Sequence, residues 1–304
     1  LMPEELPSQG SLATAQADIP AKYRDFVEKL RQEIGVPPAK VIALRRKLSD
    51  ELVRKQIDVI LDNKVPVLAL GLGTPSWVPE KAHKAGTLVT GLVGNVKNAK
   101  RLAGRGVDII VAQGHEAGGH TGRIGTMALV PQVVDAVKPI PVLAAGGIGD
   151  GRGLAAALAL GADGVWVGTA FIATNEAFAE FLNTNYTNKA TVDNWKRCIL
   201  EATEEDTRVT RIYTGKTARQ IKNKLIDAWE KSGMPTLPLP LQFDLIGPLE
   251  VALMEAGRTD YLSGFAGQVS GMIKEIRPAA QVVRDMVDGA TRVLEELAPI
   301  DSAT

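Results

Sequence analysis

Short apolar runs that end in glycine recur through the middle of the chain, and polar segments with helical spacing separate them. Runs of this length, bounded by glycine, are typical of the buried strands of a parallel sheet. The intervening segments repeat apolar residues every three or four positions, as amphipathic helices do. The alternation therefore predicts an α/β fold built from βα units. The expected strands are residues 65–71, 88–94, 107–114, 140–148 and 164–171, and the helices between them are residues 95–103, 126–137 and 151–160.

Two topologies fit such a sheet: an open, doubly wound sheet and part of an eight-stranded barrel. Glycines follow the last two runs, at Gly146–Gly147 and at Gly168, as they do at the phosphate site after strands seven and eight of a barrel. No GxGxxG follows the first run, although a dinucleotide-binding open sheet would carry one there. We therefore expect a TIM-type (β/α)8 barrel. The five strands would be its fourth to eighth, with about three strands upstream of Leu1.

The flanking segments predict how the chain is divided. We expect a loop and helical excursion over residues 1–48, the barrel part with its cofactor site over 49–175, and a helical cap over 176–277. A C-terminal helix over residues 278–304 is expected to return to the barrel. Helical spacing of apolar residues places individual helices at residues 21–34, 48–61, 175–183, 195–204, 218–231, 249–256 and 279–297.

Composition narrows the functional classes. The 35 basic and 35 acidic residues cancel, so the chain has no electrostatic signature of a nucleic-acid or membrane-surface protein. A single cysteine, Cys198, excludes an internal disulfide and a cysteine-based zinc site, and it suits a cytoplasmic setting. No uninterrupted apolar run approaches the roughly 20 residues of a membrane helix. The sequence leaves open whether the chain forms a homo-oligomer.

The glycines after the last two strands are candidates for phosphate binding. The backbone N–H groups of Gly147 and Ile148, together with those of Gly168 and Thr169, could surround an anion, because glycine lets the chain approach the oxygens closely. The helix that begins near Asp150 would point its positive end at the same place. Alternatively, the glycines only form tight strand-to-helix turns. Asp150 itself is expected to cap the helix.

The segment after the third run carries the candidate acid–base chemistry. His120 follows two glycines at a strand end, where an imidazole could act as a general acid or base or hydrogen-bond an anionic substrate. Alternatively, it only holds the loop. His115 is expected to point away from the cavity, and Glu116 to accept loop N–H groups. Gln113 could offer its amide to a flavin or satisfy the loop. The spacing of these groups is not that of a metal site, so no metal is expected.

Several motifs, in this order, resemble the nitronate monooxygenase family, formerly called 2-nitropropane dioxygenases, which includes FMN-dependent enoyl-reductase relatives. The resemblance covers most of the chain from residue 65 onward. One position departs from the family pattern, because Ala170 stands where the family usually has arginine. The motifs are QGHEAGGHTG (113–122), LVPQVVDAV (129–137), IPVLAAGGIGDGRGLAAALALGADGV (140–165), GTAF (168–171), EEDTRVTRIYTGKTAR (204–219) and FAGQVSG (265–271).

The resemblance implies a TIM barrel with a helical cap, non-covalent FMN, and His120 as the active-site histidine. It also implies a cap residue near the flavin, Gln268. Position in the last run alone would instead put Trp166 in the core. The residues implied to bind FMN are Gln113, Gly118, Gly146, Gly147, Trp166, Val167, Gly168, Thr169 and Gln268.

The implied activity is oxidation of an alkyl nitronate with O2 to a carbonyl compound and nitrite. The sequence does not separate it from an FMN-dependent NAD(P)H reductase of enoyl thioesters or quinones, since the shared motifs belong to the flavin site. A third hypothesis, of a different class, is a flavin-free scaffold or binding subunit.

Overall fold

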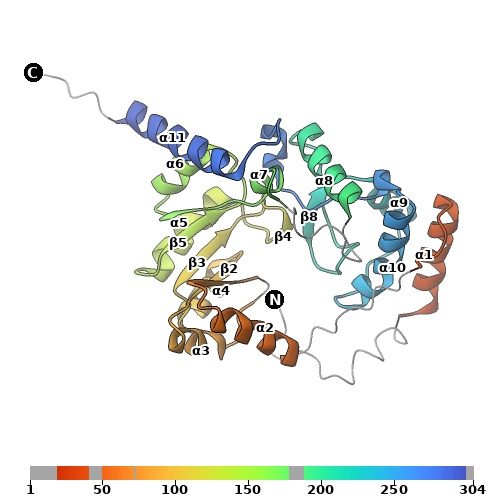
Figure 1. Ribbon diagram of the computed structural model, residues 1–304, viewed down its shortest axis with the longest axis horizontal. Helices are drawn as coiled ribbons and strands as arrows, with labels where there is room; N and C mark the ends of the chain where they lie inside the picture. The colour runs from red at the N-terminus through yellow and green to blue at the C-terminus, as the bar shows by residue number, and fades with distance from the viewer. Residues whose placement is uncertain (1–18, 41–49, 72, 178–187, 299–304) are drawn as a thin grey trace, which may run out of the picture.

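A five-stranded parallel sheet organises the computed structural model, which describes residues 19–40, 50–71, 73–177 and 188–298. Each strand pairs with the next strand of the sheet along the chain, without the reversal of order that defines a doubly wound sheet (Figure 1). This is the strand order of an arc of a TIM barrel. Each strand falls within one of the five predicted runs. The strands are β1 (Val67–Leu70), β2 (Leu88–Val93), β3 (Ile109–Gln113), β5 (Val142–Ala145) and β6 (Gly164–Trp166).

Helices follow the strands and bury their apolar faces against the sheet. Ile110, Leu129 and Val133 are fully buried in this core, and each such side chain contributes about 1.5–3 kcal/mol on burial. Side-chain caps fix where the helices begin, since Asn95 and Asp150 each accept a backbone N–H of the turn that follows. The helices are α2 (Asp50–Asp62), α3 (Val78–Lys84), α4 (Val96–Ala103), α5 (Thr126–Val137), α6 (Gly151–Ala159) and α7 (Thr169–Ile172).

The last predicted strand is shorter than expected. It ends at Trp166, because the N–H groups of Phe171 and Ile172 both bond to the Gly168 carbonyl and close a helical turn there. The expectation that Trp166 lies in the core is also wrong, since the residue is 39% exposed. Its strand lies at the edge of the described sheet, so no described strand covers its outer side.

The cap contains a second sheet that the helical prediction missed. Residues 218–221 were expected to begin a helix, but they form a strand whose four residues are all buried, and the helix starts only after Asn223 caps it. This strand pairs antiparallel with two others, one of which contains the predicted active-site histidine, His120. The three strands are β4 (Gly119–His120), β8 (Ala218–Ile221) and β7 (Thr207–Thr210), in that order.

The remaining cap elements are mostly helical. The helix expected at residues 195–204 begins earlier, at Lys189, because Asn188 forms a capping box with Thr191. Residues 175–177 are not helical, and the rest of the helix expected at 175–183 lies outside the described residues. The division of the chain at residues 48, 175 and 277 stays a prediction. The elements are α8 (Lys189–Glu201), α9 (Lys224–Ser232), α10 (Leu241–Glu255), η1 (Thr259–Tyr261) and η2 (Gln268–Met272).

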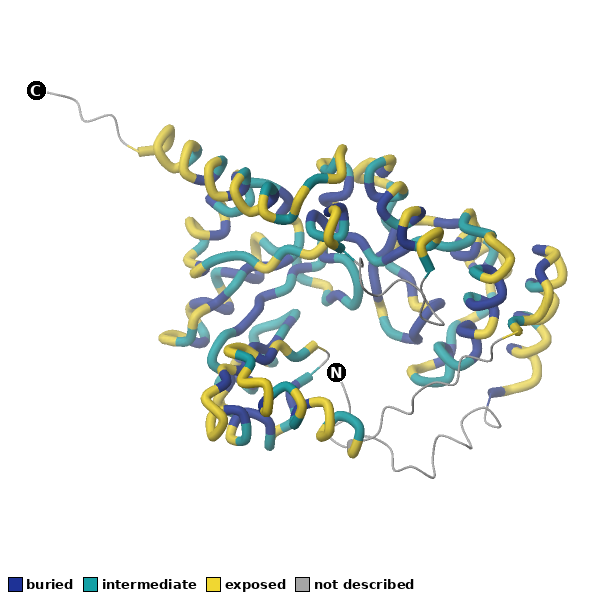
Figure 2. Tube along the Cα trace, viewed as in Figure 1, coloured by how far each residue is buried: buried dark blue, intermediate teal, exposed yellow. Residues whose placement is uncertain are grey.

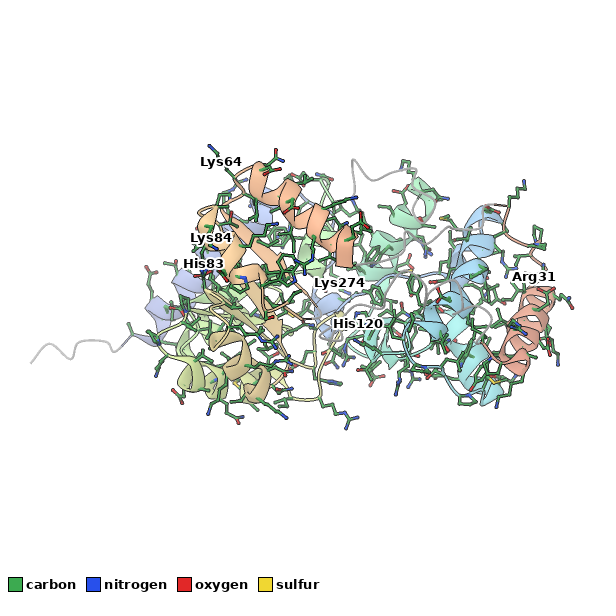
Figure 3. All side chains as sticks on the ribbon, turned by 90° about the horizontal axis from the view of Figure 1, so that it is seen from below. Arg31, Lys64, His83, Lys84, His120 and Lys274 are labelled. Carbon is green, nitrogen blue, oxygen red and sulfur yellow. The ribbon has the colours of Figure 1, made fainter. Side chains whose placement is uncertain are left out.

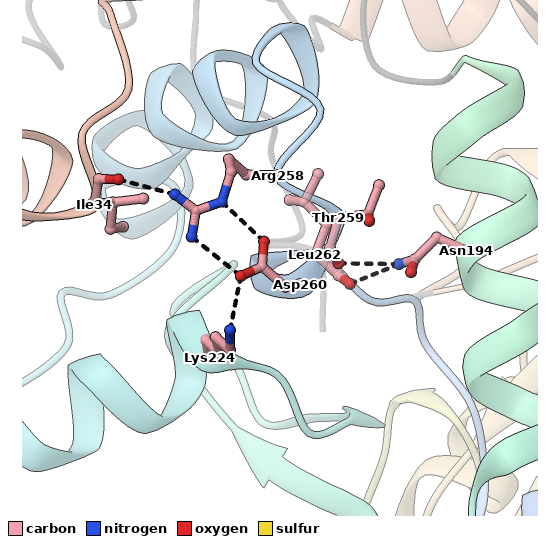
Figure 4. Close-up of polar contacts among 7 residues, drawn as sticks. All are labelled: Ile34, Asn194, Lys224, Arg258, Thr259, Asp260 and Leu262. Atoms are coloured by element: carbon pink, nitrogen blue, oxygen red, sulfur yellow. Dashed lines mark hydrogen bonds and ion pairs between the residues drawn. The ribbon is translucent and has the colours of Figure 1, made fainter.

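The first helix, α1 (Ala21–Ile34), packs against the cap rather than against the parallel sheet (Figure 1). The ring of Phe26 meets that of Trp229 edge-on at 5.0 Å. At the other end of α1, the Ile34 carbonyl accepts a hydrogen bond from Arg258 at 2.9 Å, and Asp260 joins Arg258 to Lys224 (Figure 4). The helix of the 1–48 excursion is therefore held by the cap core.

The last helix, α11 (Ala279–Leu297), matches its predicted bounds and packs on α6. Its inner face is buried, whereas its outer face is exposed along its length (Figure 2). The backbones of the two helices are in close contact at Gly151 and Gly289, where a Cβ on Gly151 would lie 2.4 Å from the backbone nitrogen of Ala290.

Among the helices that the structure describes, none is both long and apolar enough to cross a membrane.

Gly151→Ala is expected to destabilise the protein by about 1–3 kcal/mol, because the new methyl group forces α11 away from α6. Chemical denaturation measures the change. The matched control is Gly247→Ala in α10, where a Cβ meets no atom within 4 Å. That substitution should be neutral or stabilise the helix by about 0.5–1 kcal/mol. Equal effects of the two substitutions would contradict the close helix crossing.

Candidate active site

Three strands of the sheet end level with one another. Gln113 of β3 is paired with Ala145 of β5, and Ala145 is in turn paired with Trp166 of β6. The segments that follow these residues therefore leave the sheet side by side at one edge. The structure thus brings the two predicted glycine turns next to the histidine loop, as a shared site requires.

The turn after β5 carries two backbone N–H donors that have no partner among the described residues. Gly146 and Gly147 adopt φ values of +91° and +75°, a left-handed conformation that glycine adopts without strain. Gly147 is exposed, and within the described residues no hydrogen bond uses the N–H of Gly147 or Ile148. Consecutive free N–H groups in such a turn form a concave anion-binding surface.

The amino end of α6 contributes less to this surface than expected. Asp150 caps the helix, as predicted, by accepting the N–H groups of Arg152 and Gly153 at 3.0 and 3.4 Å. The same carboxylate pairs with the Arg152 guanidinium, and these hydrogen bonds lower its pKa although partial burial opposes them. An anion would therefore bind the loop N–H groups rather than the helix end.

The turn after β6 offers open space beside this loop. Gly168 is exposed, and a Cβ placed on it would meet no atom within 4 Å. Thr169 is buried instead, and its hydroxyl accepts the N–H of Gly267 at 2.9 Å, which ties the cap to the sheet edge. Val167 packs against the core. Free N–H groups at Gly147 and open space at Gly168 fit the phosphate end of a nucleotide cofactor.

The loop over residues 114–122 is clamped between the sheet edge and the cap. A Cβ on Gly118 would lie 2.6 Å from the carbonyl carbon of Ala266, and one on Gly267 would lie 2.7 Å from the Glu116 carbonyl oxygen. That carbonyl also accepts the N–H of Gln268 at 3.0 Å. The visible constraint on Gly118 is thus close backbone packing.

Glu116 accepts a backbone N–H, but the donor is the first residue of α5 and not, as had been expected, the loop. Both carboxylate oxygens lie 3.0 Å from the backbone nitrogen of Thr126, which begins α5. The carboxylate therefore caps α5, and both of its oxygens already accept hydrogen bonds from Thr126.

His120 lies in β4, between the parallel sheet and the cap (Figure 3). Its backbone carbonyl accepts the Gln113 side-chain amide at 2.8 Å, so Gln113 satisfies the loop while its Oε1 stays available as an acceptor. The imidazole is half-buried, and its Nε2 lies 2.9 Å from the Thr214 hydroxyl. Within the described residues no hydrogen bond reaches Nδ1.

The surroundings of His120 favour the uncharged imidazole. Burial, and then the nearby Lys216 ammonium, lower the pKa of His120 below its ordinary value of 6.5. At neutral pH the ring is therefore predominantly neutral. A neutral imidazole can accept a proton at one nitrogen and donate a hydrogen bond from the other.

The other candidate groups have structural roles. His115 Nδ1 lies 2.8 Å from the Gly122 carbonyl oxygen, and exposed His83 pairs with Asp108 at 2.8 Å. In the ranges that the structure covers, no three histidine, cysteine, aspartate or glutamate side chains form a metal-binding group. Burial raises the pKa of the Cys198 thiol, which is the opposite of what a nucleophilic cysteine needs.

A cavity of about 330 Å³ lies beside the loop and contains two of the predicted cofactor residues, Gly147 and Gln268. Sequence reasoning considered Glu116 for another role and singled out none of the remaining lining residues, and it assigned no role to Thr214 or Lys216. Thr214 and Lys216 both lie in the family motif over residues 204–219, but nothing in the sequence indicated that this motif contacts His120. The cavity is lined by Glu116, Gly147, Glu204, Gln268, Val269, Gly271 and Met272.

The chain is similar to known proteins over most of its length. The family model of nitronate monooxygenase matches residues 11–289. A Mycobacterium tuberculosis protein with a provisional monooxygenase name is 39% identical, and the alignment covers 92% of this chain and 76% of that protein. A Bacillus subtilis protein named "Probable nitronate monooxygenase" is 38% identical, covering 73% of this chain and 63% of its own length.

Two solved structures share the fold. The nitroalkane oxidase of Streptomyces ansochromogenes aligns with a TM-score of 0.76 and 29% identity, covering 96% of this chain and 80% of that one. FabK of Thermotoga maritima aligns with a TM-score of 0.68 and 30% identity, covering 90% and 82%. Both are TIM-barrel enzymes, which confirms the predicted fold class. With the family model and the curated relatives, they show that this chain is an oxidoreductase belonging to the nitronate monooxygenase family of flavin-dependent enzymes.

Proposed function

We propose that this chain is an FMN-dependent nitronate monooxygenase that oxidises alkyl nitronates with O2 to a carbonyl compound and nitrite. One observation carries the proposal. The half-buried imidazole of His120, whose pKa is lowered by burial, lies beside level strand ends whose glycine turns offer free N–H donors and open space. In a chain of this family, such an edge suits a flavin phosphate on the glycines and a small substrate near the histidine.

The chain's own residues would bind and orient the cofactor. The N–H groups of Gly147 and Ile148 would hold the phosphate, with the space at Gly168 leaving room for it. Among the residues implied to bind FMN, Gln113 through its Oε1 and Gln268 through its exposed amide are the side chains that would bond the ring system. When bound, FMN supplies the electron-transfer chemistry, which no side chain of the site provides.

The role that we propose for His120 depends on the substrate. An anionic nitronate needs a hydrogen-bond donor for its nitro oxygens, and the neutral ring can donate from one nitrogen. A neutral nitroalkane must first lose its α-proton, and the other ring nitrogen can accept it. The partial burial of His120 strengthens either interaction, because less water competes for the ring.

The alternative is an FMN-dependent NAD(P)H reductase of enoyl thioesters or quinones, and one set of measurements on the purified protein separates the hypotheses. We expect a yellow protein that releases FMN on denaturation and forms nitrite from the nitronate of 2-nitropropane in the presence of oxygen. Anaerobic NAD(P)H should leave its visible absorbance unchanged. Bleaching by NAD(P)H without nitrite formation would favour the reductase, and a colourless protein that binds no FMN would favour the scaffold.

His120→Ala is expected to keep FMN but to lower kcat/KM for a neutral nitroalkane by about 10²–10⁴-fold, because the proton acceptor is gone. Nitrite formation measures the rate, and the visible spectrum measures bound flavin. His83→Ala is the matched control, since that imidazole lies exposed on α3. Turnover of the His120 variant at the wild-type rate would remove this residue from the mechanism.

The pH profile follows from the neutral ring. Because the pKa of His120 is lowered, the proton-accepting form predominates above pH 6.5, and kcat/KM for a nitroalkane should fall only at lower pH. Lys216→Met removes a positive charge that disfavours protonation, so its inflection should move upward toward 6.5. A wild-type inflection above 6.5, or a downward shift in the variant, would contradict this account.

A further inference from the structure

We propose that Thr214 is a positioning residue that holds His120 as its Nε2–H tautomer, so that Nδ1 is the atom that accepts the substrate proton. The proposal rests on the proposed function of His120 as a base. It assigns a role to the YTGK segment of the sequence, which the binding of a flavin does not explain.

The contact joins two segments that lie 94 residues apart in the chain. Thr214 is 8% exposed, and its Oγ1 lies 2.9 Å from His120 Nε2. His120 is fixed on the other side by its strand pairing with Ala218 and by the Gln113 amide on its carbonyl. The His120 ring and the Thr214 hydroxyl therefore meet because the backbone of each residue is held in place by its own contacts.

Several contacts besides the Thr214 hydroxyl hold the turn that carries this residue. Gly215 has a φ of +78°, and a Cβ there would lie 2.5 Å from the Leu237 carbonyl oxygen, so the turn is pressed against the proline-rich loop. Arg211 donates two hydrogen bonds to the Gly215 carbonyl, at 2.9 and 2.6 Å. Fully buried Gln242 donates to the Ile212 carbonyl at 2.6 Å. Removing the Thr214 hydroxyl should therefore leave the turn in place.

The hydrogen bonds around Thr214 give the contact a direction. Its Oγ1 lies 3.3 Å from the Lys216 carbonyl oxygen, which can only accept, and 3.3 Å from the Lys216 backbone nitrogen, whose N–H can only donate. A hydroxyl has a single proton, so a Thr214 that donates to this carbonyl must accept from the ring. The chain of donors then runs from His120 Nε2–H to Thr214 Oγ1–H to the Lys216 carbonyl. This fixes the neutral tautomer, because the bond at one ring nitrogen determines which nitrogen carries the proton.

The chemical consequence is a lone pair at Nδ1. In the proposed proton transfer, Nδ1 takes the α-proton of a nitroalkane: the C–H bond breaks, an N–H bond forms, and the electron pair stays on the substrate as the nitronate anion. The ring becomes an imidazolium, whose Nε2–H remains bonded to Thr214. The opposite tautomer would present an N–H to the substrate, which could donate to the nitro oxygens of a nitronate but could not accept the α-proton of a nitroalkane there.

The tautomer can be measured without any substrate. The chain has three histidines, so nitrogen-15 NMR of histidine-labelled FMN-bound protein gives a simple side-chain spectrum, and a His120→Gln variant assigns the signals of His120. We expect Nε2 to be protonated and Nδ1 to be bare in the wild type and in Thr214→Ser. Thr214→Val should give a mixture of tautomers. The matched control, Thr217→Val, removes a hydroxyl from the same turn that bonds the Thr121 carbonyl instead of the ring, and it should keep the wild-type pattern.

Kinetics supply a second readout. Thr214→Val should lower kcat for a neutral nitroalkane on the order of 100-fold, with little change in KM, because the base is misoriented rather than removed. Thr214→Ser should restore most of the rate. The loss should be much smaller on a preformed nitronate, which has no α-proton to give up.

Two NMR results would overturn the proposal: a bare Nε2 with a protonated Nδ1 in the wild type, or an unchanged tautomer in Thr214→Val. Equal loss of kcat on nitroalkane and nitronate would also overturn it. Failure of the proposed function is distinguishable, since a protein without any activity on nitro compounds still gives an NMR answer on the tautomer.

Discussion

The site depends on how closely one loop, residues 114–122, packs against two neighbours at once. On one side a Cβ on Gly146 would lie 3.0 Å from the Ala117 nitrogen, and on the other a Cβ on Gly118 would lie 2.6 Å from the backbone of Ala266. Only glycine permits both approaches without moving the chain. The loop is therefore fixed relative to the strand ends and to the cap, and its position decides where His120 lies.

In this arrangement the parallel sheet and the cap contribute different parts of the site. The parallel sheet provides a level edge, with free N–H groups and open space for an anionic cofactor. The cap provides the partner strand and the hydroxyl that orient the imidazole. Burial and the Lys216 ammonium then keep the ring neutral. Cofactor binding and proton transfer thus depend largely on different elements, which meet at the loop and where the Thr169 hydroxyl accepts the N–H of Gly267.

The sequence was informative where structure depends on residues close together in the chain. Apolar runs bounded by glycine located all five parallel strands, and the family motifs indicated Gln113, His120 and the glycine turns. What it missed depends on contacts between distant segments. Residues 218–221 look compatible with a helix, but pairing with β4 and β7 makes them a strand. Thr214 acquires its position only through a partner 94 residues away, and Trp166 is exposed because β6 is an edge strand.

A crystal structure of the FMN-bound protein tests the central claim most directly. The account predicts the phosphate within hydrogen-bond distance of the N–H groups of Gly147 and Ile148, beside Gly168, with the ring system facing the His120 side of the loop. A phosphate bound elsewhere, or a ring on the far side of the sheet from His120, would contradict it.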